Sequence, residues 1–249
     1  MKNFTRAFLI QVQFLTRIPL PVKVEYSEEI FAKGVIFAPV IGLIIGLATG
    51  GVYYLALSVT HRFIASVVCA VIAEVMITGG LHLDGLADTF DGIFSNRPKE
   101  KILEIMKDSR IGTNGTIALV LAITGKIFFL LAFERHGIIG LLFIMPAVSR
   151  MNIAWAAGIS SCAREGGMAA GIIEHTGVRE MIIATALTVI ISFFYNIKAL
   201  FAVAAAIIFT VLFVKYVEKK IGGITGDIIG AVIELSEIVV IVAFLIVKY

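Results

Sequence analysis

The chain has 249 residues, of which 59% are hydrophobic and 16% charged, and its formal net charge is +3. Soluble globular domains carry about a quarter charged residues, so this composition and a mean hydropathy of +0.99 exclude that class and indicate an integral membrane protein. The two cysteines, Cys69 and Cys162, form no C-x-x-C pair, and nothing predicts a disulfide framework or a zinc site.

The first 33 residues predict a segment on the membrane surface, and not a cleaved signal. Lys2 and Arg6 precede an apolar stretch that Gln11 and Gln13 interrupt, and two prolines follow it. This pattern is typical of an amphipathic helix that lies in the interface. We expect residues 1–249 to form one membrane domain, with an interfacial segment over 1–33 and a helical bundle over 34–249.

Apolar runs of the length that a bilayer requires, about 20 residues, recur along the rest of the chain. They cover 34–59, 63–83, 111–133, 138–159, 181–195, 199–216 and 228–247. The run at 181–195 is the shortest. We therefore predict an all-α, polytopic bundle of about seven spans, with a short amphipathic helix in the connection 98–107.

Lysine and arginine gather in alternate connections between these runs. The rich segments are 2–33, 97–110, 164–179 and 215–220. By the positive-inside rule the N-terminus is cytoplasmic and the C-terminus is external. We expect the protein to lie in the cell inner (plasma) membrane. Four polar, glycine-rich clusters then share the cytoplasmic side, which predicts one composite site facing the cytoplasm: 84–91, 107–115, 160–171 and 222–227.

The first of these clusters carries three carboxylates at helical spacing. Asp84, Asp88 and Asp91 fall at i, i+4 and i+7, so a helix places them on one face. Like charges on one stripe repel, and a divalent cation would neutralise them; all-oxygen ligands favour Mg²⁺, Mn²⁺ or Ca²⁺. The alternative is an acidic, solvated helix end. His82 is a metal ligand, a proton carrier or only a hydrogen-bond partner.

The last span begins with a second acidic group. Asp227, Glu234 and Glu237 are seven and three residues apart and share a helix face. Carboxylates within a membrane are functional candidates, and the alternative is a helix-packing pair shielded by Lys126 or Arg150. Arg150 either neutralises one of them or binds a phosphate bidentately; Lys126 is interpreted as structural.

Glycines accompany both groups. Gly112 and Gly115 can present backbone N–H groups to a phosphate, with Asp108 as a further metal ligand, although an N-cap role for Asp108 fits nearly as well. Glycines at the start of the last span allow a helix or a phosphate to approach closely. Glu74, in the second span, is interpreted as a packing or salt-bridge residue, and His175 has no evident partner.

Carboxylates on two helices with glycine and arginine nearby suit divalent-metal-dependent phosphoryl transfer. The rival from another class is a cation-coupled transporter, whose buried carboxylates bind and release an ion. Nucleotide-binding motifs of the P-loop and dinucleotide types are missing, and the basic residues are too scattered for a nucleic-acid surface.

Three motifs together resemble the cobalamin synthase (adenosylcobinamide-GDP ribazoletransferase) family. They are G-G-L-H-L-D-G-L-A-D-T at 79–89, K-D-S-R-I-G at 107–112 and G-G-I-T-G-D at 222–227. Stretches at 13–19 and 37–46 extend the resemblance over nearly the whole chain. The acidic motif is also similar to that of CDP-alcohol phosphotransferases, but Asp88 stands where their D-G-x-x-A-R pattern has arginine. A related enzyme with another alcohol acceptor is therefore the alternative.

The resemblance implies a Mg²⁺-dependent membrane transferase. It would join adenosylcobinamide-GDP to α-ribazole or α-ribazole 5′-phosphate, release GMP, and form adenosylcobalamin or its 5′-phosphate. Its partners would be these substrates and the lipid bilayer, with no nucleic acid. A homo-oligomer is compatible with the small-residue face of Gly42, Gly46 and Gly50.

The resemblance also divides the candidate residues into three roles. The expected metal ligands are Asp84, Asp88, Asp91, Asp108 and Asp227. The expected catalytic residues are Asp91, Glu234, His82 and Arg110, where one of Asp91 and Glu234 accepts the proton of the attacking hydroxyl. The expected substrate-binding residues are Arg150, Gly112, Gly223, Thr225 and Gly226.

Overall fold

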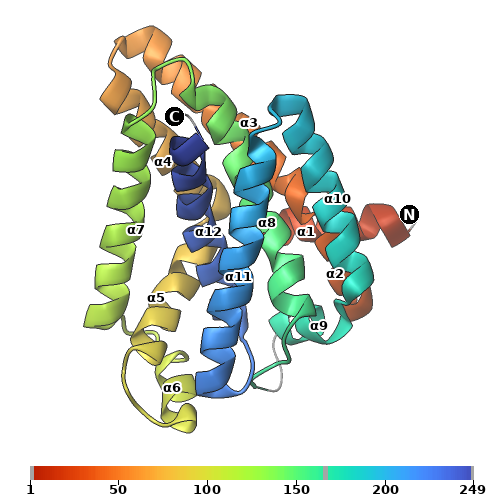
Figure 1. The fold of residues 1–249 in the computed structure, drawn as a ribbon. Helices are drawn as coiled ribbons and strands as arrows, with labels where there is room; N and C mark the ends of the chain where they lie inside the picture. Colours follow the sequence, from red (N-terminus) through yellow and green to blue (C-terminus); the bar gives the residue numbers. More distant parts are fainter. Residues whose placement is uncertain (1–2, 165–167, 248–249) are drawn as a thin grey trace.

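The computed structural model describes residues 3–164 and 168–247, and these form a bundle of helices (Figure 1). Within these ranges the β pairing is limited to an isolated bridge between Cys162 and Ile224. The helices in chain order are α1 (Asn3–Leu15), α2 (Glu28–Lys33), the 3-10 helix η1 (Gly34–Phe37), α3 (Ala38–Thr60), α4 (Phe63–Thr78), α5 (Leu81–Ile93), α6 (Lys99–Ile105), α7 (Thr113–Leu131), α8 (Ile138–Gly158), α9 (Met168–His175), α10 (Val178–Tyr195), α11 (Ala199–Ile221) and α12 (Gly226–Val247).

Six helical stretches of the described chain are long and apolar enough to cross a membrane, and a bent pair makes a possible seventh. The six are Glu28–Thr60, α7, α8, α10, α11 and α12, and the bent pair is α4 with α5. The prediction of an all-α bundle of about seven spans is therefore confirmed. The predicted amphipathic helix in the connection 98–107 is α6.

The predicted run 63–83 differs from the structure at its end. Helix α4 stops at Thr78, and the chain turns by 88° before α5 begins. Gly79 and Gly80 make this turn with φ angles of 66° and 71°, in a region that side-chain-bearing residues rarely adopt. Apolar content alone could not place this break, because the apolar pattern continues across it.

Helices α8 and α12 form the centre of the bundle, and most of their residues are buried. Helix α3 packs on α8 through the small-residue face predicted for helix association. A side chain on Gly46 would lie 2.6 Å from the carbonyl oxygen of Phe143, so the two backbones are in close contact. This glycine face is thus buried inside the chain, where it joins two of its own helices.

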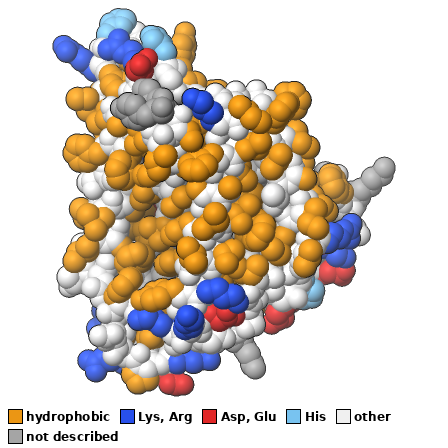
Figure 2. Space-filling model, viewed as in Figure 1, with side chains coloured by type: hydrophobic (Ala, Val, Ile, Leu, Met, Phe, Trp, Pro, Cys, Tyr) orange, Lys and Arg blue, Asp and Glu red, His pale blue; other side chains and the backbone are white. Residues whose placement is uncertain are grey.

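Apolar side chains form a broad belt across the middle of the molecule, and charged side chains gather at its two ends (Figure 2). The exposed members of this belt on α7, α10 and α11 include Ile117, Leu121, Phe128, Ile190, Phe193, Ile208 and Leu212. Such a belt fits a multi-pass membrane protein.

One end of the bundle collects three of the four predicted polar clusters, and α5, which carries the first cluster, runs toward that end (Figure 1). Helices α6 and α9, the start of α7 and the connection from α11 to α12 all lie at the lower end in Figure 1. The prediction that these segments converge is therefore supported by the fold. The side of the membrane that this end faces stays a prediction.

Helix α1 contributes to the core of the bundle as well as to its surface. Its buried residues include Ala7, Ile10, Val12 and Leu15. Just after it, the Arg17 N–H donates to the carbonyl oxygen of Ile77 at 2.6 Å, which joins the N-terminal segment to the end of α4. This attachment places α1 next to the break between α4 and α5.

Candidate functional site

The site is built where α5 crosses α12 at very short range. A side chain on Gly85 would lie 2.8 Å from the carbonyl oxygen of Asp227, and one on Gly230 would lie 3.2 Å from that of His82. Glycine at both positions lets the two backbones touch. The crossing brings the first residues of the acidic stripe to the start of α12.

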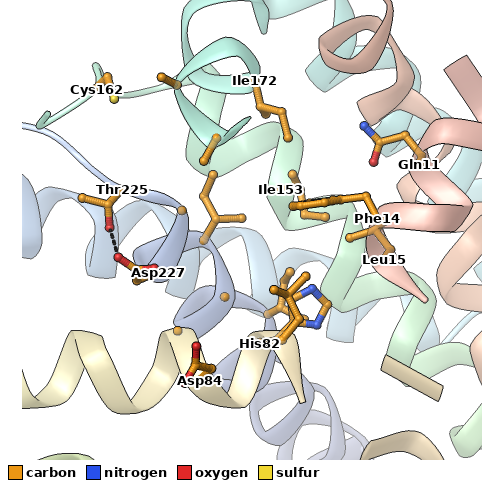
Figure 3. Close-up of a pocket in the computed structure, with 18 of the residues that line it drawn as sticks. Gln11, Phe14, Leu15, His82, Asp84, Ile153, Cys162, Ile172, Thr225 and Asp227 are labelled. Carbon is orange, nitrogen blue, oxygen red and sulfur yellow. Dashed lines mark hydrogen bonds between the residues drawn. The ribbon is translucent and has the colours of Figure 1, made fainter. Parts of the chain in front are cut away.

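A cavity of about 210 Å³ opens at this crossing (Figure 3). Helices α1, α5, α8, α9 and α12 and the segment after α8 supply its walls. Its charged and polar lining includes His82, Asp84, Arg164, Thr225 and Asp227. Its apolar lining includes Phe14, Leu15, Ile153, Ile172, Ile229 and Ile233.

Negative charge dominates the polar wall. The Arg164 guanidinium binds the Asp227 carboxylate at 3.2 Å, and the Thr225 hydroxyl donates to the same carboxylate at 3.1 Å. Asp88, half-buried beside the cavity, is repelled by Asp84, Asp227 and Asp91, and Arg164 is the cation that acts on it. Carboxylates outnumber cations in this region, which favours the binding of further positive charge.

The glycines before α12 hold the segment that carries Arg164. The Ile224 N–H donates to the carbonyl oxygen of Ser161 and the Ala163 N–H donates to that of Ile224, both at 2.8 Å. A side chain on Gly223 would meet the Ser161 oxygen at 2.5 Å. In this structure Gly223 therefore serves a backbone contact, whereas Thr225 and Gly226 line the cavity.

Asp91, the third residue of the acidic stripe, binds the start of α7. Its two carboxylate oxygens accept the N–H groups of Gly112, at 2.6 Å, and Gly115, at 2.8 Å. This is the arrangement of a helix N-cap supplied from another helix. The N–H groups proposed to bind phosphate are thus engaged by Asp91, and the geometry supports a structural role for all three residues.

Asp108 and Arg110 form an exposed pair on the connection from α6 to α7. The Arg110 Nη2 lies 2.6 Å from Asp108 Oδ2, and neither residue lines the cavity. The hydrogen bonds from Arg110 lower the pKa of Asp108 to about 2, so this carboxylate is ionised at physiological pH. The predicted metal and catalytic roles of this pair have no support from its position.

The deep acidic residues belong to a separate cluster of five buried charges. Lys126 lies 3.2 Å from Glu74 and 3.3 Å from Glu234, and it also binds Glu237. Arg150, which has 0% of its surface exposed, binds Glu237 and lies 3.5 Å from Glu74. The alternative of shielded helix-packing residues is the one that this geometry supports. It gives no support to a proton-accepting Glu234 or a phosphate-binding Arg150.

The predicted site residues therefore divide mainly between four places: the cavity, the start of α7, the exposed pair of Asp108 and Arg110, and the cluster of buried charges. His82, Asp84, Thr225, Gly226 and Asp227 meet at the cavity, and Asp88 lies beside it. Arg164 and the α1 residues were not among the predicted site residues, although Arg164 lies in a polar cluster that the sequence places near the others. Nothing in the sequence of α1 distinguishes a residue that lines a cavity from one that packs in a core.

Metal-ligand geometry is not preformed in the described residues, where no three His, Cys, Asp or Glu side chains come close enough to hold one ion. Mg²⁺ does not require such a cage, because it commonly binds one or two carboxylates, several waters and substrate phosphates. Asp84, Asp88 and Asp227 supply only oxygen ligands. This donor set fits Mg²⁺ better than zinc.

The family model described as cobalamin-5-phosphate synthase matches residues 7–245. The chain belongs to this family. Its similar relatives are named adenosylcobinamide-GDP ribazoletransferase. That of Acetivibrio thermocellus is 40% identical over 99% of this chain and 100% of the relative. That of Caldanaerobacter subterraneus is 38% identical over 96% and 97% of the two chains.

No solved structure matches the chain. Family membership confirms what the three sequence motifs indicated. In this cobalamin-5-phosphate synthase family member, the motifs at 79–89 and 222–227 form the crossing of α5 with α12, whereas the motif at 107–112 supports the start of α7. Two of the three motifs therefore build the cavity directly.

Proposed function

We propose that the chain joins adenosylcobinamide-GDP to ribazole, or to ribazole 5′-phosphate, and releases GMP. The observation that carries this proposal is the meeting of Asp84 and Asp227, from two helices, with Arg164 at one cavity. Carboxylates beside a guanidinium suit the handling of a diphosphate. The names of the relatives supply the two substrates.

The reaction is a displacement at phosphorus. A ribose hydroxyl oxygen that a 5′-phosphate would leave free forms a bond to the phosphorus attached to cobinamide, and the bond from that phosphorus to the bridging oxygen of the diphosphate breaks. GMP leaves with the bridging oxygen. The hydroxyl proton passes to a carboxylate of the cavity, Asp84 or its neighbour Asp88, and Arg164 offsets charge on the diphosphate.

One or two of Asp84, Asp88 and Asp227 would hold Mg²⁺ together with substrate phosphate oxygens, and a carboxylate off the metal would accept the proton. The ion would neutralise phosphate oxygens and stabilise the departing GMP. The carboxylates that crowd around Asp88 support this proposal, because their mutual repulsion falls when a cation binds. The same charges disfavour the approach of a diphosphate without a cation.

The test is release of GMP from adenosylcobinamide-GDP by purified protein in lipid nanodiscs. We expect release only when ribazole and Mg²⁺ are both present, and none with EDTA. Release without ribazole would indicate a hydrolase, and release with a different alcohol alone would indicate another phosphotransferase. Full activity in EDTA would refute the role of the metal.

A further inference from the structure

The cavity has two chemically different ends. Its polar end carries Asp84, Arg164 and Asp227, where the proposed displacement takes place. Its other wall is apolar and is formed by Phe14, Leu15, Ile153, Ile172 and Ile233, from α1, α8, α9 and α12. A ligand that fills the whole cavity must therefore carry an apolar part joined to a polar one.

Two polar residues, Gln11 and His82, lie on the apolar side. The Gln11 side-chain amide donates to the carbonyl oxygen of Phe31 at 2.7 Å, and His82 differs from it. His82 lines the cavity, only 4% of its surface is exposed, and its Nδ1 atom has no hydrogen-bond partner among the described residues. Figure 3 shows its ring beside Phe14 and Leu15. A buried polar atom without a partner costs about 1–3 kcal/mol, so a ligand that supplies the partner binds more tightly.

The size and polarity of the cavity decide which part of the substrates fits it. Pockets that bury a whole drug-sized ligand measure about 300–1,000 Å³, so 210 Å³ holds only part of such a molecule. A corrin ring is larger than this space. Guanine carries several donors and acceptors that an apolar wall would leave unpaired. A flat, largely apolar aromatic base with one acceptor nitrogen matches the apolar end of the cavity and His82.

We propose that this apolar end binds the benzimidazole base of ribazole, and that the His82 imidazole donates a hydrogen bond to the unsubstituted ring nitrogen of the base. This proposal rests on the proposed function, since it takes ribazole as the acceptor. Neutral imidazole has one N–H donor, and a hydrogen bond from it to the base gives both the histidine donor and the acceptor nitrogen of the base a partner. His82 thus positions the acceptor and sets specificity for its base, while the attached ribose reaches toward Asp84.

The test is equilibrium binding of ribazole to protein in nanodiscs, together with steady-state kinetics. We expect His82→Phe to weaken ribazole binding about 10-fold or more, which is the effect of about 1.4 kcal/mol, and to raise KM for ribazole likewise. KM for adenosylcobinamide-GDP should be unchanged. His175→Ala is the matched control, because His175 bonds the Gly171 carbonyl on α9 and does not line the cavity.

An analogue separates the hydrogen bond from packing. The α-riboside of indole lacks the acceptor nitrogen but keeps the bicyclic shape. The wild type should bind it about 10-fold more weakly than ribazole, and His82→Phe should bind the two equally. An equal preference for ribazole in wild type and variant would overturn the proposal for His82.

The apolar wall has its own pair of variants on α1. Phe14→Ala should weaken ribazole binding, whereas Phe8→Ala should not, because Phe8 packs on Phe37 outside the cavity. Equal effects of the two variants would overturn the placement of the base. GMP release by the wild type tests the proposed function separately. If the wild type releases GMP as expected but His82→Phe binds ribazole as tightly as the wild type, the role of His82 is rejected and the proposed function stands.

Discussion

Asp84 and Asp227 lie within reach of each other only because the residues that pack between their helices are glycines. Their carboxylates are charged groups at a partly enclosed cavity, which is where electrostatic effects on a transition state are largest. Asp91, seven residues after Asp84, has a different environment although it belongs to the same stripe. The position of each carboxylate in the fold, and not its spacing in sequence, separates these roles.

Asp84→Asn should lower turnover at least about 100-fold, because it removes a charge that the proposed site requires for the metal or the proton. GMP release from folded, lipid-embedded protein measures this. Glu104→Gln on α6 is the control, since Glu104 pairs with exposed Lys101 and lies outside the cavity. Turnover of Asp84→Asn near that of Glu104→Gln would contradict the proposed site.

Asp91→Ala should lower the free energy of unfolding by about 1–2 kcal/mol, because it leaves two N–H groups at the start of α7 without their acceptor. Thermal unfolding in detergent measures the loss. A variant that unfolds at the wild-type temperature but has no turnover would instead support the catalytic role that the sequence predicted for Asp91.

At the scale of elements, the break between α4 and α5 directs the acidic stripe toward the cavity. Two left-handed glycines produce the 88° bend. A continuous helix would carry Asp84 along the axis of α4 and away from the start of α12. The break is therefore a requirement of the site as well as of the fold.

Gly80→Ala tests this requirement without steric clash, because no atom lies within 4 Å of the added carbon. The left-handed φ of 71° should cost about 1–2 kcal/mol for alanine. Gly51→Ala on α3 is the matched control, because the added carbon there also meets no neighbouring atom. Gly51 lies inside a helix, so alanine should raise the free energy of unfolding by up to about 1 kcal/mol. Thermal unfolding in the same detergent compares the two variants. If both are destabilised equally, the left-handed backbone at Gly80 is not the cause.

At the scale of the whole molecule, the five buried charges connect four helices at the centre of the bundle. Glu74 lies on α4, Lys126 on α7, Arg150 on α8, and Glu234 and Glu237 on α12. Charges in an apolar interior are tolerated when they are paired, and removal of one partner leaves the others uncompensated. This cluster fixes the relative positions of the helices that carry the site.

Lys126→Met should therefore lower the free energy of unfolding by about 3–5 kcal/mol, because three carboxylates then share one cation. Lys101→Met is the matched control on α6, where the exposed pair with Glu104 contributes about 0–1 kcal/mol. Chemical unfolding in mixed micelles measures both. Similar stability of the two variants would contradict a structural role for the cluster.

The sequence by itself determined the fold class, the approximate spans and the family. The thickness of the bilayer fixes the length of an apolar span, so each span can be recognised from a local stretch of sequence. The three motifs are specific to the family when they occur together. The same reasoning located the polar clusters at one end of the bundle, because charge asymmetry between connections alternates with each crossing.

Only the tertiary structure decided which carboxylates share a site. Helical periodicity treats Asp84, Asp88 and Asp91 as one face, and Asp227, Glu234 and Glu237 as another. The crossing of α5 and α12 pairs Asp84 with Asp227 and keeps Asp88 beside them. Asp91 instead meets the start of α7, and the two glutamates meet the buried cations. Contacts between distant segments depend on the bend at Gly79 and Gly80 and on packing, and local sequence patterns do not contain that information.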